Sequence, residues 1–443
     1  MFSDLVGIET VTTMLFLCML VLMVLGLPLA FCLGGTAVVF GFLFWGPQSA
    51  YVIMLKAGNT MNETVLVAVP LFVFMGYMLE RAGIADQLFG SIRTWMGGTP
   101  GSLASTTIVG CTVVAAMSGI STTGVLMMGI IALPAMISRG YDSRLAMGSI
   151  MAGGALGALI PPSITFIVYS TISDVSIGRL FLGGLLPGLL LSGLFIGYIT
   201  TTCLLKPARG PAIPKEDRPP LSEKLRSLKD LVLPIVLIVG VLGSMFFGIA
   251  TPTEAAAVGA VGAIVSALVA RRLNWSNLSY CSLKTFSTIA MVMWIVFSAN
   301  VFASVYQGLG AAHFIQGLMT DWNVHPIVVI ILIQIIWILL GALMDSLSIL
   351  MITGPIFVPV AVALGYDPLL LGVLFVLTSE IGYLSPPFGV NLFVMRSITS
   401  SDDVPMTDIY ASVIPFIILQ IIGLILVMSF PVIATWLPDL VFG

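Results

Sequence analysis

The sequence predicts an all-α polytopic membrane protein made of two inverted repeats, and three observations lead to that prediction. The 443 residues are 58 % hydrophobic and 8 % charged, with a mean hydropathy of +1.13, which is more apolar surface than a soluble domain can bury. The apolar runs are continuous, as at 14–28, 327–343 and 413–430, whereas the strands of a membrane barrel alternate apolar and polar residues. Glycine and proline positions recur at one fixed offset.

The two halves of the chain match when one is shifted by 225 positions. Matching glycines, prolines and serines at a single offset indicate an internal repeat, which in membrane proteins is typical of transporters. The coincidences include Ser121 with Ser346, Gly157 with Gly382, Pro161 with Pro386, Pro162 with Pro387, and the tripeptide Gly-Tyr-Asp at 140–142 with the same tripeptide at 365–367.

A single segment rich in charge and proline, 206–230, separates the halves. We therefore expect a first repeat at 1–205, a linker at 206–230 and a second repeat at 231–443. Lys and Arg favour the cytoplasmic side. The loops of the first copy contain Arg81, Arg93, Arg139 and Arg144, whereas the matching loops of the second copy, at 307–326 and 363–369, contain neither residue type. Matching loops on opposite faces indicate inverted repeats, with a cytoplasmic linker and a periplasmic N-terminus.

Each copy contains an apolar stretch with helix-breaking residues at its middle. In the first copy the breaking patch is 116–124, and each flanking half has roughly 16 residues, short for a crossing of about 20. Either two crossings flank a short external turn, or two half-length helices form a re-entrant hairpin, which we favour. The expected hairpins span about 100–138 and 326–363, and the broken helices that follow them span about 142–173 and 367–397.

Two adjacent prolines interrupt the helix after each expected hairpin. A proline inside a helix removes a hydrogen bond and clashes with the preceding turn, so two in a row predict unwound backbone. Unwound backbone is tolerated in hydrocarbon only where it is buried in protein or lines a polar cavity. Its carbonyls can coordinate Na⁺, and the half-helix N-termini can bind an anion. The alternative is that the double prolines only kink helices for packing.

Acidic residues in the apolar segments indicate either function or local structure. An ionisable side chain near the bilayer centre costs about 2.5–3.5 kcal/mol. Asp345 at the expected second hairpin tip and Glu380 before the second break either coordinate a cation or accept hydrogen bonds from loop N–H groups. Thr251, Pro252 and Glu254 instead form a capping box with proline at the first helical position, which is structural. Because no Lys or Arg lies at a tip or break, cation symport is favoured over anion exchange, and proton coupling stays open.

Motifs of catalysis and metal binding are missing from the sequence. There is no HExxH, GxSxG or phosphate loop, and the five cysteines have no metal or disulfide spacing. We therefore expect no enzyme, no transition-metal site, no organic cofactor and no nucleic-acid partner. The polar stretches 46–65 and 275–286 are expected to lie along the membrane interface.

The chain resembles the large membrane subunit (DctM-type) of a tripartite ATP-independent periplasmic (TRAP) transporter, in order and over nearly its whole length. The residues that carry the resemblance are SGISTTG at 118–124, GALIPPSITFIVY at 157–169, GIATPTEAAAVG at 248–259, ALMDSLSILMITGPIFVPV at 342–360 and SEIGYLSPPFGVNLFV at 379–394. The resemblance implies an elevator-type transporter of the bacterial inner membrane that imports organic acids with a Na⁺ gradient. It also implies two partners, a periplasmic substrate-binding protein and a small four-helix membrane subunit.

The same resemblance implies that two or more Na⁺ ions and the substrate bind at the hairpin tips and helix breaks. Ile120 departs from the family pattern at the first tip, where many relatives have a run closer to SGSS. The alternatives are a stand-alone Na⁺- or H⁺-coupled dicarboxylate or citrate carrier and, from a different class, a membrane scaffold or sensor without transport. The candidate residues are Ser118, Gly119, Ser121, Thr122, Gly157, Pro161, Pro162, Ser163, Asp345, Ser346, Glu380, Gly382, Ser385, Pro386, Pro387 and Asn391.

Overall fold

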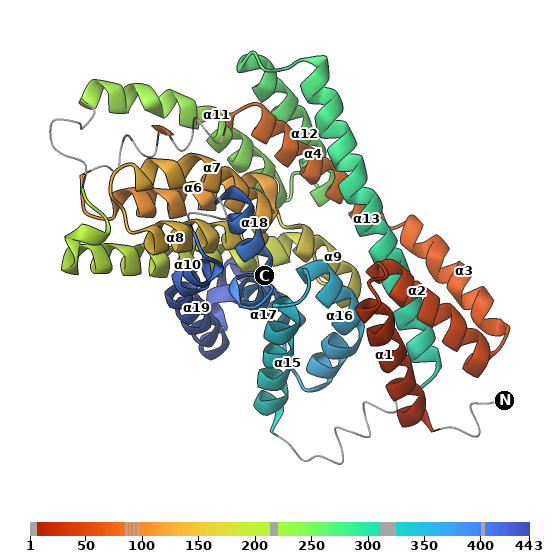
Figure 1. Cartoon of the computed structure of the whole chain (residues 1–443). Coiled ribbons are helices and arrows are strands. Elements are labelled where there is room, and N and C mark those ends of the chain that lie inside the picture. The colour runs from red at the N-terminus through yellow and green to blue at the C-terminus, as the bar shows by residue number, and fades with distance from the viewer. Residues whose placement is uncertain are drawn as a thin grey trace.

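The computed structural model is an assembly of helices in which all regular secondary structure of the described part is helical (Figure 1). It describes residues 7–84, 87, 90, 91, 94, 98–212, 220–310, 325–399 and 404–443. Arg93, the linker residues 213–219 and the loop residues 311–324 lie outside the described part, so the charge comparison between matching loops stays a prediction.

One group of helices, called the frame below, packs around the long helix α13, which contacts α2, α3 and α4. In Figure 1 this group occupies the right side and the top of the molecule. Close helix approach is allowed by small residues: a Cβ at Gly259 of α12 would lie 2.6 Å from the Met75 sulfur of α4. The frame consists of α1 (Ile8–Val24), α2 (Leu29–Phe40), α3 (Gln48–Met61), α4 (Ala68–Arg81), α11 (Leu221–Phe246), α12 (Pro252–Val269) and α13 (Trp275–Gly308).

The second group of helices, called the bundle below, contains the expected tips and breaks of both halves of the chain. It touches the frame mainly where α16 meets α13 and where α6 and α9 meet α4. The bundle consists of α6 (Ser102–Ser118), α7 (Ser121–Ile137), α8 (Ser143–Ala155), the short 3₁₀ turn η4 (Leu156–Ala158), α9 (Ile164–Ser173), α10 (Ile177–Leu205), α15 (Pro326–Gly341), α16 (Ser346–Ala363), α17 (Pro368–Leu384), α18 (Val390–Ile398), α19 (Met406–Ser429) and α20 (Val432–Phe442).

Side-chain caps fix where several of these helices begin. Asp142 accepts a hydrogen bond from the Leu145 N–H at 2.9 Å, and Asp367 accepts one from the Leu369 N–H at 2.8 Å, so both Gly-Tyr-Asp copies end in an N-cap. At the start of α12, the Thr251 Oγ1 accepts from the Glu254 N–H at 3.3 Å, and the Glu254 carboxylate accepts from the Thr251 N–H at 2.8 Å. Pro252 occupies the first helical position, so these residues form a capping box.

Six helices of the described part are long and apolar enough to cross a membrane by length and composition. Those spans are Thr64–Arg81, Ile177–Leu205, Pro252–Val269, Trp275–Gly308, Ser346–Ala363 and Met406–Ser429.

The polar stretch 275–286 is not a separate helix. It is the first third of α13, which runs unbroken for 34 residues. A helix of that length is about 51 Å long, against about 30 Å for the hydrocarbon core, so it reaches beyond the apolar layer or crosses it with a tilt. Nothing in 275–286 interrupts a helix, since the segment has no glycine or proline.

Candidate functional site

The first tip, residues 119–120, joins α6 to α7 and rests on the backbone of the first break, residues 159–163. Gly119 has φ +65°, a conformation that favours glycine, and a Cβ there would collide with the Pro162 carbonyl oxygen. A Cβ at Gly157 would lie 3.0 Å from the Ile120 carbonyl oxygen. The tip and the break therefore meet backbone to backbone. Ser118 is the last residue of α6, and its side chain lies outside the described part.

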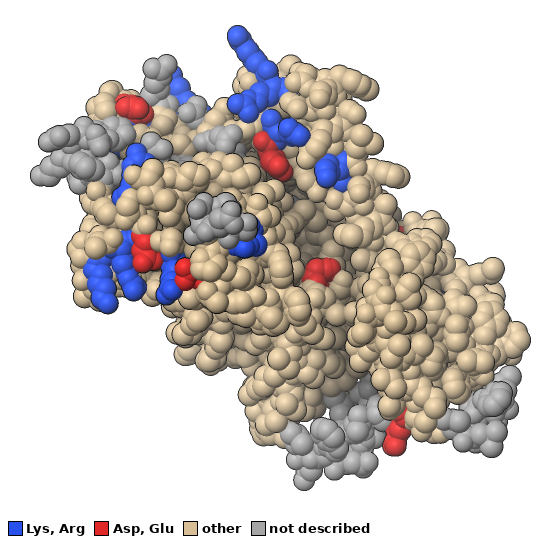
Figure 2. Space-filling view, in the orientation of Figure 1, with Lys and Arg blue, Asp and Glu red and all other residues tan. Residues whose placement is uncertain are grey.

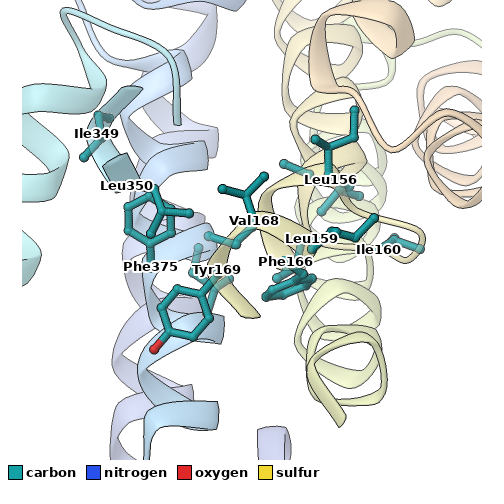
Figure 3. Close-up of a cluster of buried hydrophobic side chains, with 14 of the residues drawn as sticks. Leu156, Leu159, Ile160, Phe166, Val168, Tyr169, Ile349, Leu350 and Phe375 are labelled. Carbon is teal, nitrogen blue, oxygen red and sulfur yellow. The ribbon is translucent and has the colours of Figure 1, made fainter. Parts of the chain in front are cut away.

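The first break separates η4 from α9. The Ser163 hydroxyl donates to the Ala158 carbonyl at 2.5 Å and accepts from the Phe166 N–H at 3.4 Å, so it ties the two half-helices together and caps α9. The peptide bond between Pro161 and Pro162 is cis. Figure 3 shows apolar side chains of the break and of α9, such as Leu159 and Phe166, in one cluster with side chains of α16 and α17 such as Leu350 and Phe375.

The second tip, residues 342–345, joins α15 to α16 and is held by side chains. Asp345 is the N-cap of α16: its carboxylate accepts from the Ser348 N–H at 3.1 Å and from the Ser348 hydroxyl at 2.6 Å. The Tyr383 hydroxyl accepts from the Ser346 N–H at 2.9 Å and donates to the Ser346 hydroxyl at 2.6 Å. The Ser346 and Ser348 N–H groups at the start of α16 are therefore both bonded to protein side chains.

The second break, residues 385–389, separates α17 from α18. A Cβ at Gly341, the last residue of α15, would lie 2.9 Å from the Gly382 Cα, so α15 and α17 touch through their backbones just before the break. The Ser385 hydroxyl donates to the Ile381 carbonyl at 2.7 Å. The peptide bond between Pro386 and Pro387 is cis, and the Pro387 carbonyl accepts from the Tyr410 hydroxyl at 3.0 Å.

Each tip also bonds to the helix that follows the break of the other half of the chain. The Ser121 hydroxyl, at the start of α7, lies 3.0 Å from the Asn391 Nδ2 and 3.2 Å from its Oδ1, at the start of α18. The Ser346 hydroxyl, at the start of α16, lies 3.1 Å from the Thr165 hydroxyl, at the start of α9. Below, the starts of α7 and α18 are called the Asn391 pair, and the starts of α16 and α9 the Asp345 pair.

The two pairs differ in how their helix starts are capped. No side chain caps α7, whose N-cap is Ile120, or α18, whose N-cap is Gly389. In the Asp345 pair, the Asp345 carboxylate caps α16 and the Ser163 hydroxyl caps α9. An uncapped helix start presents free N–H groups and a positive dipole end, which together bind anions. The Asn391 pair thus has the electrostatics of an anion site, whereas the Asp345 pair already contains a carboxylate.

Glu380 is a buried carboxylate with unused oxygens. Its side chain is 0 % exposed, and neither carboxylate oxygen has a hydrogen-bond partner. The backbone N–H of Leu159, in the first break, lies near the carboxylate but donates to the Leu156 carbonyl at 3.1 Å. A buried carboxylate without a partner is expensive and is the kind of group that a bound cation or proton satisfies.

A narrow crevice lies where the first tip faces the frame. The crevice is too narrow to admit a water molecule, and it is lined by Val73, Gly76 and Tyr77 of α4 with Ile120 and Thr123. The Tyr77 hydroxyl lies 3.2 Å from the Thr288 hydroxyl of α13. Binding sites for small molecules usually have roughly 300–1,000 Å³, so the crevice as it stands has no room for a solute.

The structure brings most of the candidate residues together and adds two that the sequence analysis missed. Ser121 meets Asn391 and Ser346 meets Thr165 across the two halves, and Thr122 follows Ser121 as the second residue of α7. Thr165 and Tyr383 were missed, although both stand inside motifs that were recognised. The signal that could have found them is a hydroxyl inside a buried apolar stretch, three residues from the nearer proline of a double proline.

Comparison with protein families gives one family model that covers nearly the whole chain. The model described as "Tripartite ATP-independent periplasmic transporter, DctM component" matches residues 16–433.

Several curated relatives match over more than 90 % of their length. The C4-dicarboxylate TRAP transporter large permease protein DctM of Pseudomonas aeruginosa is 33 % identical over 90 % of this chain and 91 % of that protein. The sialic acid TRAP transporter large permease protein SiaM of Vibrio cholerae is 31 % identical over 94 % and 96 %, and the ectoine TRAP transporter large permease protein TeaC of Halomonas elongata is 28 % identical over 97 % and 100 %.

Among solved structures, the YdaH transporter of Alcanivorax borkumensis has a similar fold. The TM-score is 0.63 at 15 % identity, over 87 % of this chain and 90 % of that one. The MtrF structure of Neisseria gonorrhoeae has a TM-score of 0.58 at 14 % identity, over 89 % and 85 %. At these identities the likeness concerns the fold alone, a helical membrane transporter fold.

Proposed function

Because the chain belongs to the DctM component family of tripartite ATP-independent periplasmic transporters, we propose that it is the transport subunit of a Na⁺-coupled importer of a small organic acid. Proteins of this family are multi-pass membrane permeases and not enzymes. The observation that carries the proposal is the contrast between the two pairs of helix starts. One pair offers uncapped N–H groups to an anion, and the other holds a carboxylate suited to a cation.

The substrate class rests on the Asn391 pair. Two uncapped helix starts converge at Ser121 and Asn391, and no Lys or Arg stands at 118–124 or 385–391. A carboxylate there would be met by backbone N–H groups, by the Asn391 amide and by helix dipoles. The printed names of the relatives refer to C4-dicarboxylate, sialic acid and ectoine, which supports a small organic solute as cargo.

Na⁺ coupling rests on the carboxylates of the second half. Asp345 and Glu380 provide oxygens of the kind that a hard cation prefers, and the two Glu380 oxygens have no partner. The proposed Na⁺ ligands are these two carboxylates, carbonyls of the breaks and the hydroxyl of Ser385. A bound Na⁺ supplies positive charge beside an anionic solute, so the solute and the ion are favoured together. Two or more Na⁺ ions would bind, at the two sites where a tip meets a break.

The elevator mechanism and the inverted repeats belong to the same proposal. The bundle contacts the frame at only a few helices, and the crevice at the first tip lies on that contact. Ser121 and Ser346 are equivalent under the offset of 225, and each bonds to a residue of the other half of the chain. This pattern supports two repeats that face each other. In this mechanism the bundle carries both pairs past a fixed frame, with the linker 206–230 cytoplasmic and the N-terminus periplasmic.

The proposed partners are a small four-helix membrane subunit and a periplasmic substrate-binding protein, in the bacterial inner membrane. The experiment is uptake of radiolabelled organic acids into proteoliposomes that contain this chain with both partners. An inward Na⁺ gradient should drive uptake, and replacing Na⁺ by K⁺ at equal ionic strength should abolish it. Uptake that persists in K⁺ would reject Na⁺ coupling. Uptake without the binding protein would favour a stand-alone dicarboxylate or citrate carrier instead.

A further inference from the structure

Four cationic side chains gather where three candidate spans of the frame end. The span Thr64–Arg81 ends at Arg81, and Arg271 and Arg272 form the turn between the spans Pro252–Val269 and Trp275–Gly308. The contacts below bring these three ends together, so the cations stand at the level where hydrocarbon gives way to headgroups. Arg81, Arg271, Arg272 and Lys284 are called the basic cluster, and all four are exposed.

Side chains of the basic cluster pack against the Tyr280 ring and against the turn at Gly83. The Arg81 guanidinium carbon lies 3.8 Å from the centre of the Tyr280 ring, and the Lys284 Nζ lies 5.9 Å from it, which are cation–π distances. The Arg272 guanidinium packs on the turn after α4, where a Cβ at Gly83 (φ +71°) would lie 2.5 Å from its nearest nitrogen. Side chains from α4, from the turn between α12 and α13, and from α13 therefore converge.

Backbone hydrogen bonds hold the turn that contains Arg271 and Arg272. The Arg271 N–H donates to the Leu268 carbonyl at 3.0 Å, and the Arg272 N–H donates to the Ala267 carbonyl at 2.9 Å, which closes the end of α12. Arg271 has φ +55°, a position that glycine normally takes at the end of a helix. The chain thus has a cation where backbone geometry alone favours glycine.

Among the described residues, no ion pair neutralises the charge of the basic cluster. The ion pairs of the described residues are Arg144 with Asp408 and Arg179 with Asp439, and neither involves the cluster. Of the described carboxylates, Glu80 lies close enough to act on Arg81. Figure 2 shows Lys and Arg along the upper and left parts of the visible face, and the ends of α11, α12 and α13 lie at the top in the same orientation (Figure 1).

Large apolar side chains stand beside the cluster on the first third of α13. Trp275, Leu283 and Phe286 are 80 %, 66 % and 74 % exposed. Tryptophan is typical of the headgroup level of a membrane, and exposed Leu and Phe next to it suit acyl chains. The surface therefore combines cations that have no ion pair among the described residues with an apolar flank, which suits a phospholipid with a net negative headgroup.

We propose that the basic cluster is a binding site for an anionic glycerophospholipid, whose phosphate is held by Arg81, Arg272 and Lys284 and whose acyl chains lie along α13. Guanidinium groups bind phosphate through paired N–H donors, and clusters of Lys and Arg next to a span favour anionic lipid. The site fastens the frame to one leaflet at the end of three spans. It is independent of the solute and of Na⁺.

The experiment measures lipid retention by the intact chain. The protein is delipidated in mild detergent, titrated with phosphatidylglycerol or with phosphatidylcholine of the same acyl chains, and examined by native mass spectrometry. Phosphatidylglycerol should bind more tightly. The double variant Arg272→Gln/Lys284→Gln should weaken it about 30-fold, since each cation near the surface accounts for about fivefold. The matched control Lys206→Gln/Lys229→Gln, which removes two exposed cations elsewhere, should change it less than about twofold.

Equal binding of the two lipids, or equal loss in both double variants, overturns the proposal. If the Arg272 change disturbs folding, as judged by size-exclusion chromatography, the single variant Lys284→Gln decides, because this side chain is exposed and lies 5.9 Å from the centre of the Tyr280 ring. It should weaken phosphatidylglycerol about fivefold, and no change overturns the proposal. Loss of the bound lipid when a partner chain is added would show that the partner protein binds this surface, and would also overturn the proposal.

Discussion

The Asn391 pair and the Asp345 pair occupy equivalent places in the two halves of the chain, yet they are built differently. In both, a serine at the start of a tip helix bonds to the start of the half-helix after the opposite break. In the Asn391 pair the partner is a primary amide between two uncapped helix starts. In the Asp345 pair the partner is the Thr165 hydroxyl, and Asp345, Ser163 and Tyr383 occupy the N–H groups.

The difference teaches how a duplicated unit can bind two kinds of charge. The offset of 225 places Asn391 on Phe166 and Thr165 on Val390, so each half bonds through a position that is apolar in the other. Free N–H groups and an amide suit an anion, whereas a carboxylate suits a cation. In the proposed function, the two halves supply similar frameworks, and a few side chains decide which charge each framework holds.

The largest effect is expected from Asn391→Ala. The Asn391 amide bonds to the Ser121 hydroxyl and donates to the Met151 carbonyl at 3.4 Å, so its loss removes a solute contact and leaves buried groups without partners. The substrate KM for uptake should rise about 10- to 100-fold, while the Na⁺ concentration for half-maximal uptake changes little. Thr165→Val is the matched variant of the other pair. If it raises the substrate KM as much as Asn391→Ala does, the assignment of the anion to the Asn391 pair is wrong.

The second effect is expected from Asp345→Asn, which removes the charge and keeps the cap. Asparagine caps a helix about as well as aspartate does, so α16 should still begin at Ser346. The Na⁺ concentration for half-maximal uptake should rise about tenfold, because a charged ligand contributes more than a neutral one. The substrate KM at saturating Na⁺ should change less than about twofold. A Na⁺ titration of uptake checks this, and a shift in KM alone would contradict it.

The sequence predicted where helices would be interrupted but not which interruptions would meet. Double prolines and glycines report local conformation, so the positions of the breaks at 159–163 and 385–389 could be read from residues within a few positions. Ser121 and Asn391 are 270 residues apart, and their contact depends on how the two halves pack, which no local pattern encodes. A single sequence also could not tell that Tyr383 would reach the start of α16, since its hydroxyl looks incidental in an apolar stretch.

The unbroken helix α13 shows a second limit of prediction from sequence, which concerns where a helix begins. Its first third, 275–286, was set apart on polarity, which reports the environment of a segment and not whether the helix continues. Propensity decides continuity, and this segment contains no glycine or proline.

A smaller effect is expected from Tyr383→Phe, which separates the hydroxyl from the ring. The ring stays to fill the buried space, and the Ser346 N–H and hydroxyl lose a partner, at a cost of about 1–2 kcal/mol. The Na⁺ concentration for half-maximal uptake should rise about three- to fivefold, since the second tip is less well held. Tyr169→Phe is the matched control, because its hydroxyl bonds to the Pro368 carbonyl at 2.7 Å, away from both tips. Equal effects of the two variants on Na⁺ dependence would contradict a specific role of Tyr383.

The smallest effect is expected from Thr251→Ala, which removes a helix cap outside both pairs. The Thr251 hydroxyl accepts from the Glu254 N–H and donates to the Glu254 carboxylate at 2.8 Å, and these groups are exposed. Loss of such a cap costs about 1 kcal/mol, so the thermal midpoint should fall by about 2 °C or less in a chain of this size. The substrate KM and the Na⁺ dependence should not change. This variant measures the effect of losing a helix cap without losing a charge at either tip. If it shifts the Na⁺ dependence of uptake as much as Asp345→Asn does, the effect of Asp345→Asn comes from helix stability and not from charge.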